Sequence, residues 1–350
     1  MNILQISFHT APMNSLGVND GGGLNVYVES ISRELAKDNI VHIITGEQAK
    51  NISKKNLKLS SFNLFTNQAN TEEKKEFLDE FIEKTFQYIE EHEIDVVHAH
   101  YWLSGLVAKE IKQRYKIPFI FTSHSLGVFI QENGLDRISA EKEIFNSADK
   151  ITASSQFEKE NLLNRYGADK LKIHIVTPGL NEKTFKAFRG EKRKNIILSV
   201  GRIQKQKGQL QTLDLFKNLQ YRIKGLELIF VGGPSGADGE AYLTKMKNKI
   251  EELRIEDEVQ FVGSLSQKKL VKLMRKSKLL IHSAESETFG LVAIEAHRSG
   301  LPVLSTNQGS FKEIISNNED GLVSKSFEDI QVYDFIIKLF ENEEYRSQLI

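Results

Sequence analysis

Two glutamates in the stretch "AESETFGLVAIEAHRSG" are the residues best placed, by type and spacing, to do chemistry. Glu287 comes before a helix whose start is marked by "TFG", and Glu295 follows eight residues later. Eight residues are about two helical turns, so both carboxylates can address one ligand from the same side. The unpaired backbone N–H groups of Phe289, Gly290 and Leu291 are expected to face that ligand. Carboxylates accept paired hydroxyl groups well, which indicates a polyhydroxylated ligand.

A simpler interpretation stays open for the same two residues. Glu287 would then only favour the positive end of the helix, and Glu295 would be a surface residue. Ile294 and Ala296 flank Glu295, however, so a carboxylate between them is expected to have a partner.

Two cations in "SVGRIQKQKG" form a second candidate cluster. Gly201 ends an apolar strand, Arg202 follows it, and Lys207 comes five residues after the arginine. An arginine fork and a lysine point charge at the end of a strand suit a diphosphate. The alternative is a solvated basic loop. Together with the two glutamates, this cluster indicates a ligand with hydroxyl groups at both ends of a diphosphate, which describes a nucleotide sugar.

A glycine run, "DGGG", lies between the first apolar strand and an amphipathic helix. Gly21, Gly22 and Gly23 would let the backbone approach a ligand closely, and the following helix offers its positive end to an anion. The run does not fit the G-x-G-x-x-G pattern of dinucleotide binding. A tight turn explains it comparably well.

Short apolar runs that alternate with helical patterns must position these residues. The strand-like runs are "NILQISF", "IVHIIT", "IDVVHAH", "IPFIFTSH", "KITASS" and "KIHIVTPG", then "NIILSVG", "LELIFVGG", "VQFVGSL", "KLLIHSA" and "PVLSTNQG". Strand–helix alternation predicts an α/β chain with two doubly wound, Rossmann-like domains. We expect an N-terminal domain over residues 1–178, a polar linker over 179–194 and a C-terminal domain over 195–350. Ligands bind at the carboxyl ends of such strands, so the site is expected in a cleft between the domains.

Composition excludes several classes of function. The 47 basic and 47 acidic residues balance, which argues against nucleic acid as the main partner. Cysteine is absent, so thiol nucleophiles and thiolate metal sites are excluded. No apolar run approaches the roughly 20 residues of a membrane span, and the start lacks the features of a signal peptide. A cytoplasmic protein without a transmembrane segment is expected.

The whole chain resembles the retaining glycosyltransferases of the GT-B fold, family 4. It is most similar to the branch with sucrose-phosphate synthase and the inositol-phosphate N-acetylglucosaminyltransferase of mycothiol synthesis. The matching stretches occur in family order: "HTAP", "DGGGLNVYV", "DVVHAHYWLSG", "TSHSLG", "RISAEKEIFNSADKITASS", "VTPGLN", "VGRIQKQKG", "VGGPSG" and "SESETFGLVAIEAHRSGLPVLST". The E-x7-E pattern from Glu287 to Glu295 is the most specific of these marks.

The resemblance implies roles on the donor side. Arg202 and Lys207 would neutralise the departing diphosphate, so no metal ion or other cofactor is expected. Glu295 would hold the nucleotide ribose, and Glu287 the hydroxyl groups of the donor sugar. His124 would lie at the reaction centre. The backbone of Gly201, Phe289, Gly290 and Leu291 would line the donor site, with Gly21, Gly22 and Gly23 closing over the sugar and phosphates.

The reaction implied is transfer of a hexose with retention at the anomeric carbon. The donor would be a UDP-sugar, carrying glucose or N-acetylglucosamine, and the departing phosphate would take the acceptor proton. Alternatives are a non-catalytic subunit that binds a nucleotide sugar, a transferase with a lipid or glycan acceptor, and a nucleotide-sugar epimerase, although that group lacks this E-x7-E context. A homodimer is a further possibility.

The acceptor implied is a sugar phosphate or polyol phosphate, held by residues matching Asn25, Tyr101 and Arg137, with Lys75. Arg137 is the main indication of a phosphate. Its alternative is a salt bridge with Glu141, four residues on, at a helix surface.

Three neighbouring aromatic residues are open to other interpretations. His98 and His100 alternate along one strand and suggest a metal site, but no further ligand is evident, so structure or acceptor binding is favoured. Trp102 is suited to stacking on a sugar, although core packing is the more common role.

The chain departs from the family pattern in two places. The segment between "IITG" and "DEFIEKTF", where acceptor-binding elements usually lie, is short. The last residues are "ENEEYRSQLI", whereas family members continue into helices that cross back onto the first domain, so these crossover helices are expected to be missing.

Overall fold

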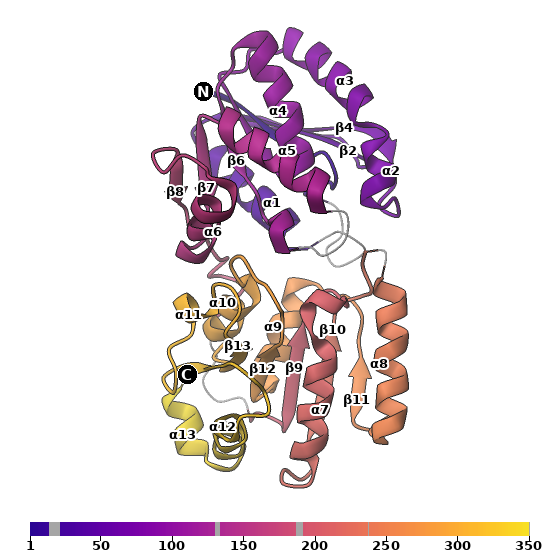
Figure 1. Cartoon of the computed structure of the whole chain (residues 1–350), viewed down its shortest axis with the longest axis vertical. Coiled ribbons are helices and arrows are strands. Elements are labelled where there is room, and N and C mark those ends of the chain that lie inside the picture. The colour runs from indigo at the N-terminus through magenta and orange to yellow at the C-terminus, as the bar shows by residue number, and fades with distance from the viewer. Residues whose placement is uncertain (14–21, 130–133, 187–191, 237, 350) are drawn as a thin grey trace. The chain divides into compact units, whose positions relative to one another are not determined.

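Two compact units make up the computed structural model, which describes residues 1–13, 22–129, 134–186, 192–236 and 238–349. The chain passes from the first unit to the second between Pro178 and Gly179. Each unit has its own sheet and its own core, and both are drawn in Figure 1. No helix within the described ranges is long and apolar enough to cross a bilayer.

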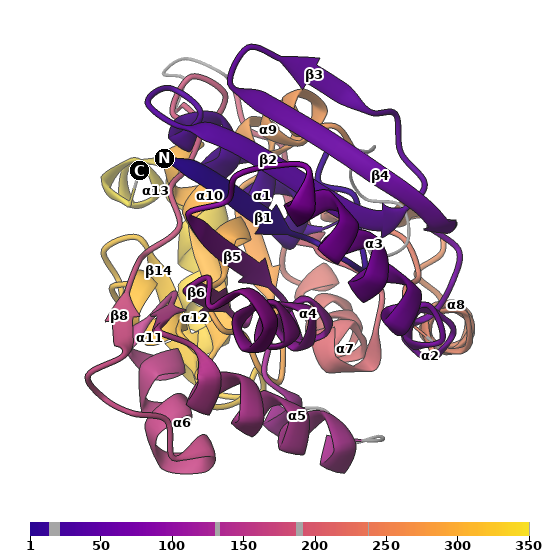
Figure 2. The ribbon, with the colours of Figure 1, turned by 90° about the horizontal axis from the view of Figure 1, so that it is seen from above.

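The N-terminal unit contains, within the described residues, an eight-stranded sheet of order β3-β4-β2-β1-β5-β6-β7-β8. Its pairs are parallel except β3 with β4, which form an antiparallel edge that Figure 2 shows from above. The strands are β1 (Asn2–Ile6), β2 (Ile40–Glu47), β3 (Ile52–Lys54), β4 (Leu57–Phe65), β5 (Val96–His100), β6 (Phe119–Thr122), β7 (Lys150–Ala153) and β8 (Ile173–Ile175). The helices are α1 (Gly23–Leu35), α2 (Thr71–Lys75), α3 (Leu78–Glu90), α4 (Trp102–Tyr115), α5 (Gly134–Ser147) and α6 (Gln156–Tyr166), with a 3₁₀ turn at Gly127–Phe129.

The C-terminal unit contains, within the described residues, a six-stranded parallel sheet of order β11-β10-β9-β12-β13-β14. Its strands are β9 (Ile196–Val200), β10 (Glu227–Val231), β11 (Val259–Phe261), β12 (Leu279–His282), β13 (Val303–Thr306) and β14 (Gly321–Ser324). Its helices are α7 (Gln209–Gln220), α8 (Gly239–Leu253), α9 (Gln267–Lys276), α10 (Leu291–Arg298), α11 (Phe311–Ile314), α12 (Ile330–Glu341) and α13 (Glu343–Gln348), with a 3₁₀ turn at Lys205–Lys207.

Successive strand residues of the C-terminal unit enter two different cores, because side chains alternate across a sheet. Ile197 and Ile281 pack with α7, α8 and α12 on one face. Leu198 and Leu280 pack with α9, α10 and α11 on the other. Both faces of the sheet are therefore covered by helices, as in a doubly wound domain.

The predicted α/β class with two Rossmann-like sheets is confirmed, and every strand named from the sequence is present. The β3–β4 hairpin and β14 were not anticipated. β4, "LKLSSFNLF", has one buried face, so its apolar residues alternate with polar ones and give no continuous run. Part of the expected linker packs on the C-terminal unit: Phe185 is in its core, and Arg193 donates to the backbone carbonyls of Ser277 and Gly300 at 2.6 Å each.

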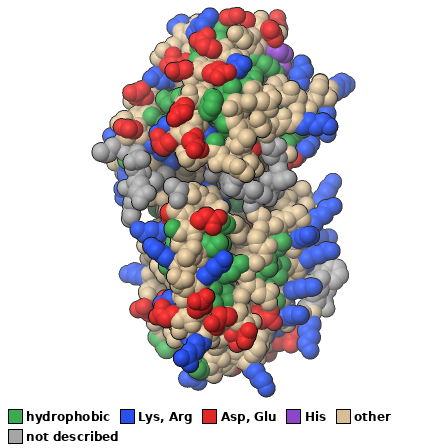
Figure 3. Space-filling view, turned by 90° about the vertical axis from the view of Figure 1, so that its right-hand side faces the viewer, with side chains coloured by type: hydrophobic (Ala, Val, Ile, Leu, Met, Phe, Trp, Pro, Cys, Tyr) green, Lys and Arg blue, Asp and Glu red, His purple; other side chains and the backbone are tan. Residues whose placement is uncertain are grey.

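Both signs of charge appear on the surface. The face shown in Figure 3 carries Lys and Arg side chains as well as Asp and Glu side chains on each unit. This mixture agrees with the formal net charge of zero.

Candidate active site

The predicted donor residues of the C-terminal unit follow two neighbouring parallel strands. β9 leads into Gly201, Arg202 and Lys207, and β12 leads into Glu287. β9 and β12 are hydrogen-bonded side by side, so both segments leave the sheet at its carboxyl edge. This is the edge at which doubly wound sheets bind ligands.

Lys207 and Glu287 form an ion pair at this edge. Lys207 Nζ lies 2.8 Å from Glu287 Oε2, and both side chains are mostly buried. Burial alone would raise the pKa of Glu287, but Lys207, His282 and the backbone N–H of Phe289 lower that pKa to about 2. The carboxylate is therefore held ionised as a hydrogen-bond acceptor. The Phe289 N–H, which we expected to face a ligand, is used by Glu287 instead.

Close backbone packing fixes both members of the pair. Gly208, with φ +64°, lies so near β12 that a Cβ there would be 2.1 Å from the Ser283 carbonyl oxygen. Ser283 Oγ donates to the Lys207 carbonyl at 2.9 Å. Gly309, with φ +81°, is equally close to Glu287, where a Cβ would be 2.2 Å from the carbonyl oxygen. Only glycine meets both requirements of space and left-handed φ at these points.

Glu295 lies on α10, which starts after Gly290 in the left-handed conformation. Burial raises the pKa of Glu295 to about 7. The sequence led us to expect a partner for this carboxylate. Among the described residues no hydrogen bond or ion pair reaches it, and burial is the cause of its raised pKa, so a partner from a bound ligand stays a prediction. A desolvated carboxylate without internal partners is suited to accept hydroxyl groups from a ligand.

Arg202 and the backbone beside it complete the β9 loop. The Arg202 side chain is exposed, and its carbonyl accepts a hydrogen bond from Gln209 Nε2 at 2.8 Å. Gly201 lies directly before it, and the Gly201 N–H donates to the Val231 carbonyl at 2.9 Å. Leu291, the first residue of α10, is partly exposed. The structure thus places Arg202 in the same loop as Lys207.

His282 was not singled out from the sequence. It is buried at the end of β12, and its Nε2 lies 3.7 Å from Glu287 Oε2. Burial, followed by the charge of Lys207, lowers the pKa of His282 to about 4, so the ring is neutral. The signal available was a histidine that ends the apolar run "KLLIH", at the carboxyl edge of the sheet.

His124 of the N-terminal unit follows β6 in a left-handed conformation, with φ +59°. Its Nε2 lies 3.0 Å from His100 Nδ1, and His100 Nε2 contacts Gln5 Oε1. Burial lowers the pKa of His124 to about 3 and holds that of His100 well below its usual range. Both rings are neutral. Gln5 was not recognised from the sequence because it lies within the apolar run of β1.

His98 and His9 extend the same aromatic cluster. The His98 ring centroid lies 4.1 Å from that of His100, and the His9 ring lies 4.2 Å from Tyr101. His98 Nε2 also contacts Thr122 Oγ1 at 2.8 Å. In the part of the chain that the structure describes, no group of three or more His, Cys, Asp or Glu residues is arranged to hold a metal ion. These histidines form a packed, hydrogen-bonded network.

Tyr101 and Arg137, two of the predicted acceptor residues, are in contact. Arg137 NH1 lies 3.3 Å from the Tyr101 hydroxyl, and the guanidinium lies over the ring at 4.8 Å. Arg137 Nε also donates to Glu141 Oε1 at 2.7 Å. The salt bridge considered as an alternative is therefore present, but it is buried and not at the helix surface. NH2 of Arg137 donates to the Ser125 carbonyl at 2.8 Å, so each nitrogen of the guanidinium group has a hydrogen-bond partner within the protein.

Lys75 and Asn25 lie on other elements of the same unit. Lys75 Nζ pairs with Glu72 at 2.8 Å and lies over the Trp102 ring at 5.2 Å. Asn25 is buried on α1, and its Nδ2 donates to the Ala11 carbonyl at 3.1 Å. Trp102 is buried in the core, as its common role predicts.

The glycine run is described only in part. Gly22 is the residue before α1, and Gly23 is its first residue. The backbone N–H of Asn25 donates to the Gly22 carbonyl at 3.1 Å. Gly21 lies outside the described residues, so the predicted closure of this run over a donor stays a prediction.

Comparison with known proteins supplies the family. Residues 21–184 match the model "Glycosyltransferase Family 4", and residues 181–350 match the model "Glycosyl transferases group 1". D-inositol 3-phosphate glycosyltransferase of Frankia alni is 30% identical to the chain over 378 aligned positions, which cover 97% of this chain and 91% of that protein.

Solved structures show the same fold. Sucrose-phosphate synthase from Thermosynechococcus elongatus has a TM-score of 0.88 at 24% identity, covering 99% of this chain and 92% of the other. HepE of Anabaena, in complex with UDP-glucose, has a TM-score of 0.78 at 17% identity, covering 100% and 92%. With both family models and a full-length relative in agreement, the chain belongs to the GT-B glycosyltransferases of family 4.

Proposed function

We propose that this glycosyltransferase moves a hexose from a UDP-sugar to a small phosphorylated sugar or polyol, with retention at the anomeric carbon. The observation that carries the proposal is the Lys207–Glu287 pair, 2.8 Å apart at the carboxyl edge of the C-terminal sheet. In this pair the ammonium group of Lys207, which can bind a phosphate, lies beside the carboxylate of Glu287, which can accept hydrogen bonds from sugar hydroxyls. Glu295, without a partner among the described residues, supplies a second carboxylate on α10 for a ribose.

The identity of the substrates rests on the relatives. HepE was solved with UDP-glucose, and the Frankia relative is named for inositol 3-phosphate. Sucrose phosphate, the product for which the structural neighbour is named, combines a glucosyl unit with a phosphorylated fructosyl unit. Glucose and N-acetylglucosamine are the sugars that we propose for the donor, and inositol 3-phosphate and fructose 6-phosphate are the first acceptors to test.

The proposed chemistry breaks the bond between the anomeric carbon and the diphosphate oxygen, and forms the new bond to the acceptor oxygen on the same face. The acceptor proton passes to the departing phosphate. Lys207 and Arg202 stabilise the negative charge on that phosphate, and Glu287 holds the sugar hydroxyls. His124, neutral because burial lowers its pKa, orients groups by hydrogen bonding and not by charge. The two cations are proposed to replace a metal ion.

The test is turnover of UDP-glucose and UDP-N-acetylglucosamine, with ADP- and GDP-glucose as competitors, in the presence of each acceptor and with EDTA. Proton NMR of the product reads the anomeric configuration. We expect transfer with retention that EDTA does not reduce and that Glu287→Gln and Lys207→Met each lower at least about 100-fold. Lys217→Met, at a partly exposed lysine on α7 outside the β9 and β12 loops, is the matched control. An inverted product, or no turnover of any donor, would overturn the proposal.

A further inference from the structure

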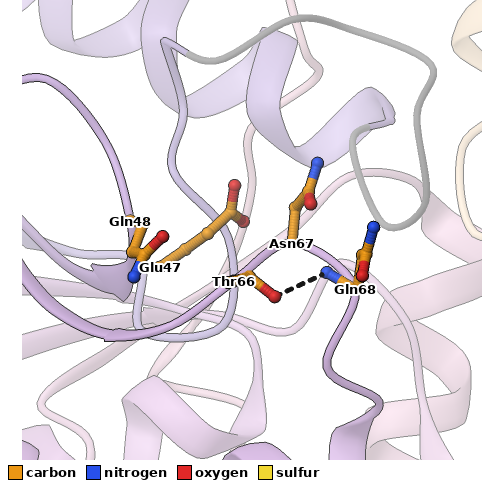
Figure 4. A pocket seen from close by; sticks show the side chains of 5 residues that line it. All are labelled: Glu47, Gln48, Thr66, Asn67 and Gln68. Atoms are coloured by element: carbon orange, nitrogen blue, oxygen red, sulfur yellow. Dashed lines mark hydrogen bonds between the residues drawn. The ribbon is translucent and has the colours of Figure 1, made fainter.

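Among the described residues of the N-terminal unit, three glutamates are buried: Glu47, Glu141 and Glu158. A buried carboxylate is unfavourable unless hydrogen bonds compensate it, so its partners indicate what it holds in place. Glu47, which lines the polar cavity shown in Figure 4, accepts from the Ala11 N–H at 3.2 Å, in the loop after β1. The other two glutamates both bind the segment 123–127, which follows β6 and carries the predicted reaction-centre residue His124.

His124 has a left-handed backbone conformation, with φ +59°. This conformation is unfavourable for a residue with a Cβ, and it persists only where the surrounding structure holds it. Thr122, two residues earlier, belongs to β6. Ser125, one residue later, is held by Arg137, whose NH2 donates to the Ser125 carbonyl at 2.8 Å. Ser123 and His124 are therefore the two residues that link these fixed points.

Ser123 is held by Glu158 of α6. The Ser123 hydroxyl donates to Oε1 of Glu158, and both side chains are buried. Oε2 of the same carboxylate accepts from the Ser154 N–H at 2.7 Å and from the Ser154 hydroxyl. Ser123 directly follows β6 and Ser154 directly follows β7, and these strands are parallel neighbours. The Glu158 carboxylate thus connects the residues that follow two adjacent strands.

Helix capping does not account for the contact between Glu158 and Ser123. Ser155 is the N-cap of α6, and its side chain accepts from the Glu158 N–H at 3.1 Å. Ser155 and Glu158 have the S-x-x-E spacing of a capping box, in which the glutamate side chain binds the backbone N–H of the N-cap residue. A contact with Ser123, in another loop and 35 residues away, is not part of that motif.

The ring and the backbone of His124 are held by different residues. His124 Nε2 lies 3.0 Å from His100 Nδ1, a contact that orients the ring. The hydrogen bond from Ser123 to Glu158 restrains the backbone directly before His124. Because the ring is attached to this backbone, a rotation of the peptide unit between Ser123 and His124 would move the ring as well.

We propose that Glu158 is a positioning residue for the reaction, which through Ser123 keeps His124 in its left-handed conformation. The proposal rests on the proposed function, in which His124 lies at the reaction centre. It adds to that function a buried residue that acts through Ser123 and His124 and not on the substrates. The role of Glu158 depends on its hydrogen bonds, so a side chain that reproduces these bonds is expected to replace it.

Three variants test the role of the contact in turnover. Glu158→Leu removes the acceptor of the Ser123 hydroxyl, and Ser123→Ala removes that hydroxyl, which tests the contact even if Glu158→Leu does not fold. We expect kcat to fall about 100-fold in Glu158→Leu and clearly in Ser123→Ala, with the KM for the UDP-sugar nearly unchanged, because a misplaced catalytic group has effects of this size. Glu158→Gln is expected to retain most of the kcat, since its oxygen can accept from Ser154 and its NH2 group can donate to Ser123 Oγ.

A fourth variant controls for lost stability. Leu162→Ala, at a buried core residue of the same helix, is expected to lower the unfolding temperature and to leave kcat unchanged. The double variant Ser123→Ala/Glu158→Leu is expected to be no slower than Glu158→Leu, because both changes remove one contact. Wild-type kcat in Glu158→Leu, additive losses in the double variant, or an equal loss of kcat in Leu162→Ala would each overturn the proposal.

NMR of histidine-labelled protein separates this proposal from the proposed function, because it needs no turnover. The Cα and Cβ chemical shifts of His124 measure its backbone conformation. We expect left-handed values in the wild type, Glu158→Gln and Leu162→Ala, and values displaced from them in Glu158→Leu and Ser123→Ala. Displaced shifts in these two variants support the positioning of His124 by Glu158 even if no sugar transfer is found. Unchanged shifts in both variants overturn it even if transfer is found.

Discussion

Glu295 is the predicted ligand of the nucleotide ribose, but its burial disfavours the ionised form of its carboxylate. Burial raises its pKa from 4.5 to about 7. Below pH 4.5 both the folded and the unfolded chain hold the proton. Between pH 4.5 and 7 the unfolded chain releases it while the folded chain keeps it, so the free energy of unfolding falls over this range and stays low above it. The cost amounts to about 3 kcal/mol.

Glu295→Gln is therefore expected to make the ligand-free protein more stable at pH 8, by up to about 3 kcal/mol, and to leave stability near pH 4.5 unchanged. The same change replaces one of the two carboxylate oxygens, which accept from ribose hydroxyls, by an NH2 donor and removes the charge, so UDP affinity is expected to fall. Urea unfolding at the two pH values and calorimetric titration with UDP measure these effects. A variant that is no more stable than the wild type at pH 8 would show that the carboxylate has an internal partner.

His100 is expected to set the tautomer of His124. Gln5 Oε1 can only accept, so the proton of neutral His100 is on Nε2, and its Nδ1 accepts from His124 Nε2. His100→Phe keeps an aromatic ring but removes both hydrogen bonds. We expect kcat to fall about 10- to 100-fold with the KM for the donor nearly unchanged, because orientation is lost and binding is not.

Nitrogen-15 NMR of the histidine rings measures the tautomer of His124. A purely structural role of His100 would leave this tautomer unchanged in the variant. The wild type is expected to show His124 protonated at Nε2, and the variant to show a mixture of tautomers. His92→Phe is the matched control, since His92 stacks on Tyr88 at 4.1 Å in another part of the unit. A variant with normal kcat, or an unchanged His124 tautomer, would remove this role from His100.

The position of the loop that carries Glu287 depends on Gly309, which lies in the segment after β13 and packs against the backbone of that loop. Both Gly309 and Gly225 have positive φ, but only at Gly309 would a Cβ collide with a neighbour, the Glu287 carbonyl oxygen. Each Gly→Ala change is expected to cost about 1 kcal/mol of stability from backbone strain. Gly309→Ala is expected in addition to displace Glu287 and to weaken nucleotide-sugar binding, although residue 309 has no predicted contact with the ligand.

Titration of both variants with UDP-glucose checks this prediction, with thermal unfolding to confirm that each is folded. Gly225→Ala serves as the control, because nothing lies within 4 Å of a Cβ at that position. Equal donor affinity in the two variants would mean that the contact between residue 309 and the Glu287 backbone does not position the carboxylate.

The sequence predicted the elements better than the contacts between them. Continuous apolar runs such as "NIILSV" identify buried parallel strands, and the strand ends then locate Arg202, Lys207 and Glu287. β4 was missed because one of its faces is polar, so that its apolar residues form no continuous run. The contact between Gln5 and His100 joins residues 95 positions apart, and no local pattern reports a pairing of that kind.

Each of the two units has hydrophobic cores of its own, and the single tryptophan of the chain belongs to a core of the N-terminal unit. Trp102 is buried among β1, β5 and α4 of the N-terminal unit, whereas Lys207, Glu287 and Glu295 belong to the C-terminal unit. Tryptophan fluorescence therefore follows unfolding of the N-terminal unit, and far-UV circular dichroism follows both.

UDP alone, without an acceptor, is expected to stabilise the C-terminal unit by mass action, by about 2.7 kcal/mol at a concentration of 100 Kd. We expect UDP to move the circular-dichroism transition to higher temperature and to leave the fluorescence transition nearly in place. Glu295→Gln should abolish the shift, and Gln113→Ala, a change at an exposed amide on α4 of the N-terminal unit, should retain it. If the fluorescence and circular-dichroism transitions shift by the same amount, the two units unfold as one cooperative body, and this measurement does not assign the nucleotide site to the C-terminal unit. If only the fluorescence transition shifts, the nucleotide binds to the N-terminal unit.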